Sequence, residues 1–204
     1  RKGKSVSLRD NMKENIILVD CDGVLCDWEY SFTQWMNHKG YPTSDSTQYN
    51  VAKRFNLAGD FGKNVVAEFN DSASIAFLPP LRDAVYYIKR LNMLHGYRFH
   101  CITSLSEDKY AQRLRTQNLE LLFGKEIFDE FVYLPCGADK DEVLAKYKGT
   151  ECFWVEDKPE NAEVGEKLGL NSILVAHEHN AYYDGDIPRY WKWKHIYNHI
   201  TGES

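Results

Sequence analysis

The feature that most constrains the fold is a series of short apolar runs separated by helix-length segments. The first run, IILVD at 16–20, is continuously apolar rather than alternating, which is typical of a strand buried on both faces. Because strands that alternate with helices need crossover connections, the pattern predicts an α/β fold: a Rossmann-like core with a mainly parallel sheet and helices on both faces. Four further strands are expected at 97–103, 130–134, 151–155 and 172–176.

The segments between these runs carry helical signals. Residues 83–94 repeat apolar side chains at helical spacing. Residues 107–123 begin after Ser106, the expected N-cap, and end before a glycine. Further helices are expected at 140–147, at 159–169, which opens on proline and closes on glycine, and at 191–200, where a last helix docks on the core.

One interval breaks the alternation. From Asp27 to Leu81 the chain is aromatic and polar, with helical pieces such as WEYSFTQWMNH and no clear strand. More than fifty residues is too long for a loop between a strand and its return helix. We therefore expect a helical cap at 28–79, inserted into an α/β core formed by 15–27 and 80–204, with 1–14 a disordered tail or residues added for expression.

Composition narrows the class of partner and the compartment. The formal net charge of −5 gives no general attraction to nucleic acid, so no nucleic-acid polymer is expected as a partner. No apolar run reaches the length of a membrane span, and the basic start has no apolar stretch of a signal peptide behind it. The five cysteines follow no zinc or CxxC spacing, which favours a reducing, cytoplasmic setting.

Polar residues end three of the predicted strands. Asp20 with Asp22, Thr103 with Ser104, and Glu156 with Asp157 follow the first, second and fourth apolar runs. Ligands of such sheets bind beyond the carboxyl ends of the strands, so these side chains are expected to meet there. Carboxylates that crowd together need a cation or a proton between them, and hard oxygen ligands suit Mg²⁺. A single acidic residue after a strand is more often a turn or cap residue, but three suitable strand ends favour a site.

The spacing of Asp20 and Asp22 also has a chemical consequence. Alternate residues of an extended segment point the same way, so both carboxylates can approach one phosphoryl group, while Cys21 points away and Gly23 allows a tight turn. Because two adjacent carboxylates are not both comfortably ionised, one tends to hold a proton. A nucleophile and an acid in neighbouring positions are what a covalent phosphatase needs.

Four segments resemble the motifs of the haloacid dehalogenase superfamily, in the order of that family. VDCDGVLCDW is similar to its first motif and CITS to its second. Lys140, at the head of a helix, is similar to the third, and FWVEDKPEN to the fourth. The resemblance runs from Asn15 to about Ala176, and its first and fourth motifs are the specific ones.

The resemblance implies a role for each matched residue. Asp20 would be the nucleophile and a metal ligand, and Asp22 the general acid/base, with its main-chain carbonyl also on Mg²⁺. Asp157 would be the second carboxylate on the metal. Thr103, Ser104 and Lys140 would hold the phosphoryl oxygens, and Glu156 would stand in the outer shell. Dehalogenases and phosphonatases of this fold lack an acid at the position of Asp22, so its presence favours phosphate esters.

The substrate is less closely defined. FLPPLRDAVYYIKRL, CITS and LFGKEIFDEFVYLP resemble the 5′(3′)-deoxyribonucleotidase branch, which implies a nucleoside monophosphate as substrate. Trp28 would then stack on the base, although packing between cap and core is an equal alternative for this residue. The segment after Asp157 follows the general pattern of the superfamily rather than that of the branch.

Three alternatives stay open. The chain could be a phosphatase or phosphotransferase of sugar phosphates or of nucleic-acid 3′ ends. It could also be a non-catalytic domain that binds a phosphorylated ligand, which is disfavoured because every catalytic position is filled.

His177 and His179 form an H-x-H after the last predicted strand, and we expect a surface loop there rather than a metal site, because no third ligand is near in sequence.

Overall fold

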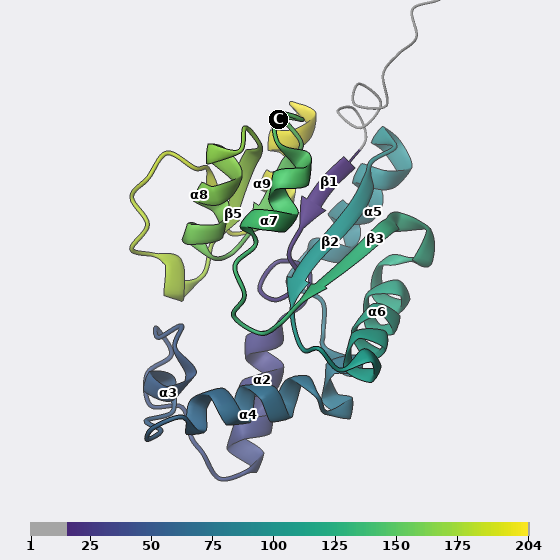
Figure 1. The fold of residues 1–204 in the computed structure, drawn as a ribbon. Coiled ribbons are helices and arrows are strands. Elements are labelled where there is room, and N and C mark those ends of the chain that lie inside the picture. The colour runs from purple at the N-terminus through teal and green to yellow at the C-terminus, as the bar shows by residue number, and fades with distance from the viewer. Residues whose placement is uncertain (1–15, 204) are drawn as a thin grey trace, which may run out of the picture.

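The computed structural model describes residues 16–203, and the predicted tail at 1–14 lies outside them. Within the described residues one six-stranded sheet has the order β3-β2-β1-β4-β5-β6, and all paired strands run parallel. The prediction of a Rossmann-like α/β core is confirmed (Figure 1). The strands are β1 Ile16–Val19, β2 Arg98–Ser104, β3 Phe128–Leu134, β4 Phe153–Glu156, β5 Asn171–Val175 and β6 Arg189–Tyr190.

Both faces of the sheet are buried, which explains why β1 reads as a continuous apolar run. Ile17 and Val19 pack on one face with residues of helices α5, α6 and α9, whereas Leu18 packs on the opposite face with residues of α7 and α8. Side chains alternate between the faces of a strand, so a strand covered on both sides must be apolar at every position. The helices of the core are α5 Ala84–His95, α6 Lys109–Phe123, α7 Asp141–Leu144, α8 Pro159–Lys167 and α9 Trp193–Thr201, with short 3₁₀ turns η2 Lys125–Ile127, η3 Ala145–Tyr147 and η4 Glu178–Asn180.

Several boundaries differ from those expected. The N-cap of α6 is Asp108, whose carboxylate accepts from the N–H groups of Tyr110 and Ala111, and not Ser106. Strand β4 begins at Phe153 rather than at residue 151, because Glu151 has φ +58, which is incompatible with an extended strand. The two-residue strand β6 was not predicted, since so short a segment has no apolar run.

Residues 28–79, which we call the cap, contain helices and no strand, and they lie beyond the carboxyl ends of β1 and β2 (Figure 1). The helices are α2 Trp28–His38, α3 Val51–Arg54, α4 Phe61–Asn70 and the 3₁₀ turn η1 Ala73–Phe77. Helix α2 begins where Asp27 caps the N–H of Tyr30. The buried rings of Phe32 and Phe69 meet edge to face at 5.3 Å, so aromatic packing joins α2 to α4.

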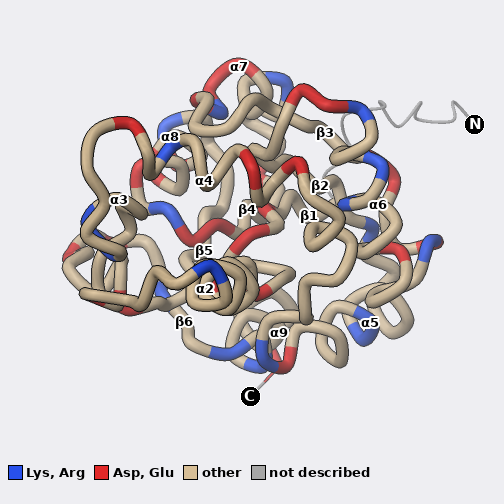
Figure 2. Tube along the Cα trace, turned by 90° about the horizontal axis from the view of Figure 1, so that it is seen from below, with Lys and Arg blue, Asp and Glu red and all other residues tan. Residues whose placement is uncertain are grey.

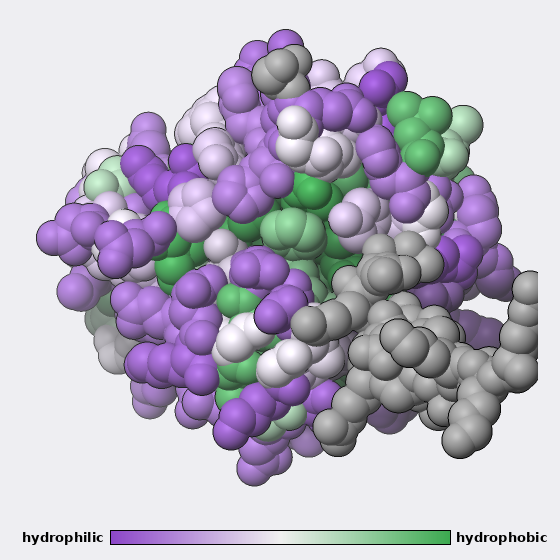
Figure 3. Space-filling view, turned by 90° about the horizontal axis from the view of Figure 1, so that it is seen from above, coloured by the Kyte–Doolittle hydropathy of each residue, from purple (hydrophilic) through white to green (hydrophobic). Residues whose placement is uncertain are grey.

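Figure 3 shows the side of the molecule opposite the cap. There, hydrophilic residues surround a hollow in which hydrophobic side chains are visible. The C-terminal helix α9 docks as expected, on the same face of the sheet as α5, with Trp193, Ile196 and Tyr197 buried. None of the helices within residues 16–203 combines the length and hydropathy that a membrane span needs.

Candidate active site

The acidic residues that end β1 and β4 lie side by side. The two strands are neighbours at the centre of the sheet, and the N–H of Asp20 donates to the carbonyl of Val155 at 3.0 Å. From β1 the chain runs outward to β2 and β3 and then returns to the other side as β4, which makes this edge the switch point where ligands of such sheets bind. Viewed from the cap side, acidic positions gather in the middle of the molecule near β4 (Figure 2).

Lys140 binds two of these carboxylates. Its ammonium lies 2.9 Å from Oδ2 of Asp20 and 2.8 Å from Oε2 of Glu156. Glu156 is fully buried, and its other oxygen accepts from the N–H groups of Asp157 and Lys158. The residue immediately before α7 thus brings a buried cation to the carboxyl end of β1, although more than a hundred residues separate them in sequence.

The charge balance of this cluster is negative. Burial, followed by the charge of Glu156, raises the pKa of Asp20 to about 6 even though Lys140 acts in the opposite direction. For Lys140, burial lowers the pKa, but Asp20 and Glu156 more than compensate, so the pKa is raised and the ammonium stays charged. Asp20, Glu156 and Asp157 together oppose three carboxylates to one ammonium, and such a site attracts a cation.

The donor set fits Mg²⁺. One carboxylate oxygen from each of Asp20, Glu156 and Asp157 lies within 4.8 Å of the others, and all three residues are buried. Hard oxygen ligands in small number, next to room for a phosphate, are the arrangement that Mg²⁺ favours. Gly23 has φ +72, and a Cβ there would lie 2.4 Å from Oδ2 of Asp157, so only glycine lets the first loop pass this close to the cluster.

Asp22 lines the same cavity, but its partner differs from that of Asp20. Its Oδ1 lies 2.9 Å from the guanidinium of Arg115, a residue of α6 that is fully buried. Burial raises the pKa of Asp22 to about 6, although the guanidinium pulls it down. The two aspartates predicted to share one phosphoryl group therefore have separate cationic partners, Lys140 for Asp20 and Arg115 for Asp22. Cys21 between them is fully buried.

Thr103 and Ser104, the two residues of the second predicted motif, have different environments in the structure. Ser104 lines the cavity, whereas Thr103 is 1% exposed and its hydroxyl accepts from Arg115 at 3.4 Å. Both residues end β2, beside β1, so both stand near Asp20 in the sheet. In the structure Ser104 is the one that a bound molecule can reach.

The cap closes the cavity, which has a volume of about 430 Å³. Trp28 lines it and also packs within the cap. Its ring stacks on Phe32 at 4.5 Å, and its indole N–H donates to Oδ1 of Asn70 at 2.9 Å. Further cap residues that line the cavity are Glu29, Tyr49, Asn50, Val51, Arg54, Lys63 and Val66.

The expectation that His177 and His179 lie in a surface loop is wrong: both line the cavity, and the side chain of His179 is 6% exposed. His177 lies between the carbonyl of Gly23, 2.7 Å from Nε2, and the guanidinium of Arg82, 3.3 Å from Nδ1. Because Arg82 can only donate, Nδ1 accepts and Nε2–H donates to Gly23. Burial lowers the pKa of His177 to about 4, consistent with this neutral form.

Arg115, Tyr49, Glu29, Arg54 and His179 belong to the site and were not predicted to. For Arg115 a signal was present, because it falls on the buried stripe of α6 between Ala111 and Leu119, where a charged residue needs a buried partner. The cap residues give no comparable signal, because nothing in a single sequence aligns a cap loop with the strand ends.

The comparisons with known proteins agree with this arrangement of strands. A haloacid dehalogenase-like hydrolase from Streptococcus pneumoniae matches with a TM-score of 0.64 and 14% identity, over 93% of this chain and 99% of that one. A phosphatase of the same superfamily from Thermococcus onnurineus matches with a TM-score of 0.59 and 14% identity, over 93% and 99%. The chain has the haloacid dehalogenase fold.

Three further findings come from the comparisons. D,D-heptose 1,7-bisphosphate phosphatase from B. bronchiseptica, solved with magnesium and phosphate, matches with a TM-score of 0.57 and 11% identity, over 93% of this chain and 99% of that one. No protein-family model matches. An uncharacterized 32.4 kDa protein of Enterobacteria phage T4 is 27% identical over 139 residues, 65% of this chain, and the matched part is 49%, about half, of that relative.

Proposed function

We propose that the chain is a Mg²⁺-dependent phosphomonoester hydrolase that works through an aspartyl-phosphate on Asp20. The observation that carries the proposal is that Asp20, Asp22, Lys140 and Asp157 meet around one cavity. Lys140 lies against Asp20, and Arg115 lies against Asp22. Similar folds among phosphatases support the proposal. We also propose that the chain divides into a core, formed by 15–27 and 80–204, and a cap, formed by 28–79. The proposed location of the protein is the cytoplasm.

In the proposed reaction a carboxylate oxygen of Asp20 attacks the phosphorus and the bond to the ester oxygen breaks. Asp22 gives its proton to that oxygen, which leaves as an alcohol. In the second step Asp22 takes a proton from water, the water oxygen bonds to phosphorus, and inorganic phosphate departs from Asp20. A pKa of about 6 for Asp22 suits a group that must both give and take a proton near neutral pH.

Asp20, Asp157 and the carbonyl of Asp22 would hold Mg²⁺, with Glu156 behind them. The ion would supply charge neutralisation for the phosphoryl oxygens. Lys140 adds a second positive charge from within the protein, 2.9 Å from the nucleophile. Ser104 would donate a hydrogen bond to a phosphoryl oxygen, and Thr103 would support Ser104 from the strand.

The proposed substrate is a small phosphorylated molecule, a nucleoside monophosphate of the 5′(3′)-deoxyribonucleotidase type. The cavity of about 430 Å³ admits a small molecule, and the acidic net charge of the chain disfavours a nucleic-acid polymer. Trp28 and Tyr49 offer aromatic rings in the cavity wall. A sugar phosphate is the second candidate, because the heptose bisphosphate phosphatase has a similar fold and the wall also contains Asn50, Arg54 and Lys63.

A screen of the purified chain separates these candidates. Phosphate release would be measured with Mg²⁺ against deoxynucleoside monophosphates, ribonucleoside monophosphates and sugar phosphates, each repeated with EDTA. We expect release from nucleoside monophosphates that EDTA abolishes. Full activity in EDTA would contradict the metal-dependent mechanism, and preference for sugar phosphates would replace the proposed substrate.

A further inference from the structure

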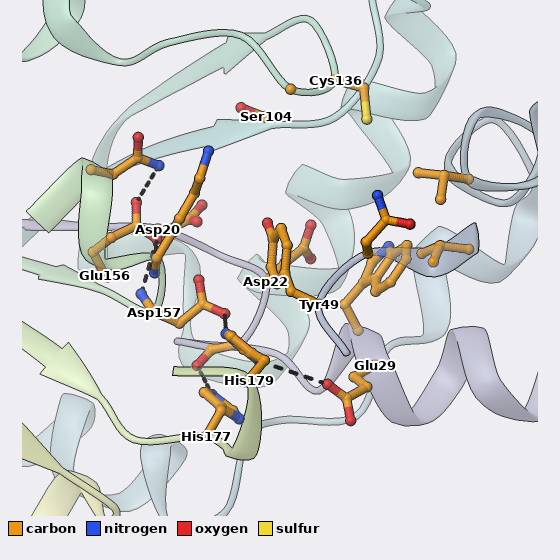
Figure 4. Close-up of a pocket in the computed structure, with 18 of the residues that line it drawn as sticks. Asp20, Asp22, Glu29, Tyr49, Ser104, Cys136, Glu156, Asp157, His177 and His179 are labelled. Atoms are coloured by element: carbon orange, nitrogen blue, oxygen red, sulfur yellow. Dashed lines mark hydrogen bonds and ion pairs between the residues drawn. The ribbon is translucent and has the colours of Figure 1, made fainter. Parts of the chain in front are cut away.

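A histidine outside the four motifs touches the cluster that the cap covers. His179 lies in η4, the turn after β5, and its Nε2 is 3.1 Å from Oδ2 of Asp157. Its Nδ1 points the other way, 4.0 Å from Oε2 of Glu29 on the cap helix α2. Figure 4 shows His179 between these two carboxylates. One imidazole thus contacts both the edge of the sheet and the cap.

The turn that carries His179 is fixed to the same loop as Asp157. Asn180 is fully buried, and its side-chain amide donates to the carbonyls of Asp157 and Val175, both at 2.8 Å. The side-chain oxygen of Asn180 accepts from the N–H of His177 at 2.9 Å. Because the backbone on both sides of His179 is held in this way, the turn stays beside Asp157, and the contacts of the imidazole itself decide where its ring lies.

The cap meets this turn at further points. The ring of Tyr49 lies 5.0 Å from that of His179, and the hydroxyl of Ser46 donates to Glu178 at 3.2 Å. Glu29 is itself held by Arg54, a buried cap residue whose guanidinium lies 2.7 Å from Oε1. A continuous series of contacts therefore runs from Arg54 through Glu29 and His179 to Asp157.

We propose that His179 is a positioning residue that orients Asp157 for the metal and couples metal binding to the docking of the cap. The inference rests on the proposed function, since it concerns the cation that Asp157 would hold. Groups that contact a metal-binding carboxylate fix its orientation, and their loss typically costs about 10- to 100-fold in metal affinity. If the cap holds His179 in place, cap contacts must strengthen metal binding, and by linkage the metal must strengthen cap docking.

The test is Mg²⁺ binding by isothermal titration calorimetry on the full chain, with no substrate present. We expect His179→Ala to weaken Mg²⁺ binding by about 10- to 100-fold, and His179→Gln, which keeps a polar group facing Asp157, to recover part of the loss. The matched control is His38→Ala, because His38 is an exposed histidine at the end of α2. Melting temperatures in EDTA separate a loss of stability from a loss of metal affinity.

The coupling is tested from the cap. Tyr49→Leu removes the ring beside His179, whereas Tyr49→Phe keeps it. We expect Tyr49→Leu to weaken Mg²⁺ binding in the wild-type background, Tyr49→Phe, which keeps the ring, to weaken it less, and Tyr49→Leu to have no further effect once His179 is alanine. Tyr49→Leu also keeps the inference testable if His179→Ala does not fold.

The outcomes separate the inference from the proposed function. If the wild-type chain binds no Mg²⁺, the proposed function fails. If the wild type binds Mg²⁺ and His179→Ala binds it equally well, His179 does not position Asp157, and only the inference fails. Additive effects of Tyr49→Leu and His179→Ala would overturn the coupling to the cap.

Discussion

The edge of the sheet and the cap face each other across one cavity, yet they are built by different interactions. At the sheet edge, buried charges hold one another: Lys140 binds Asp20 and Glu156, and Arg115 binds Asp22. In the cap, Phe32 and Phe69 are buried among aromatic rings, with Trp28 and Trp35 around them. The chemistry of the first region depends on charge and position, whereas the integrity of the second depends on packing.

The comparison implies different costs of substitution. Removing one partner of a buried ion pair leaves an unpaired charge, which is costly, but an isosteric amide keeps the shape and most of the contacts. Removing a buried ring leaves a cavity that no rearrangement fills completely. Substitutions at the sheet edge should therefore change activity more than stability, and substitutions in the cap core should do the reverse.

The largest expected effect is that of Asp20→Asn. The amide cannot act as the nucleophile, so turnover with any phosphomonoester should fall below detection, while the fold persists because the side chain keeps its size. Phosphate release and the melting temperature are measured on the same preparation. Appreciable turnover by this variant would contradict the covalent mechanism.

Asp22→Asn should slow the reaction by about 10²–10⁴-fold for esters of ordinary alcohols, because a proton must reach the leaving oxygen. The loss should shrink for 4-nitrophenyl phosphate, whose leaving group departs without a proton. The measurement is kcat for both esters with wild type and variant. An equal loss for both esters would mean that Asp22 acts on the position of the phosphoryl group and not on the leaving oxygen.

Phe69→Ala tests the cap side of the comparison. Phe69 is fully buried and contacts Trp28, Phe32 and Trp35, so the free energy of unfolding should fall by about 3–5 kcal/mol. Urea denaturation gives this value, and Met93→Ala, at an exposed apolar position of α5, is the control. If the unfolding free energy is unchanged, the aromatic cluster does not stabilise the molecule.

The same contrast explains what a single sequence could predict. The strands and the acidic residues at their ends follow from local patterns, since an apolar run that ends in Asp20 or in Glu156 and Asp157 is visible in the chain itself. The contact of Lys140 with Asp20 follows only from the resemblance to a known family, because it joins distant segments. Arg115 and His179 depend on which helix face and which turn meet the strand ends, and tertiary packing decides that.

The smallest expected effect concerns the wall of the cavity. Trp28 has a structural role, since it stacks on Phe32 and donates to Asn70, and it also lines the cavity. Trp28→Ala should therefore lower the free energy of unfolding, whatever the substrate. If the ring also stacks on a base, kcat/KM for nucleoside monophosphates should fall further, by about 1–3 kcal/mol, with little change for phenyl phosphate.

The matched control for Trp28→Ala is Tyr30→Ala on the same helix, because Tyr30 is 57% exposed and does not line the cavity. Both variants are compared with wild type at a temperature where each is fully folded, so that lost stability does not appear as lost activity. A selective loss with nucleotides in Trp28→Ala alone would assign the base to the cap. Equal losses with nucleotide and phenyl phosphate would make Trp28 a packing residue, and the nucleotide proposal would then lose its main support in the cap.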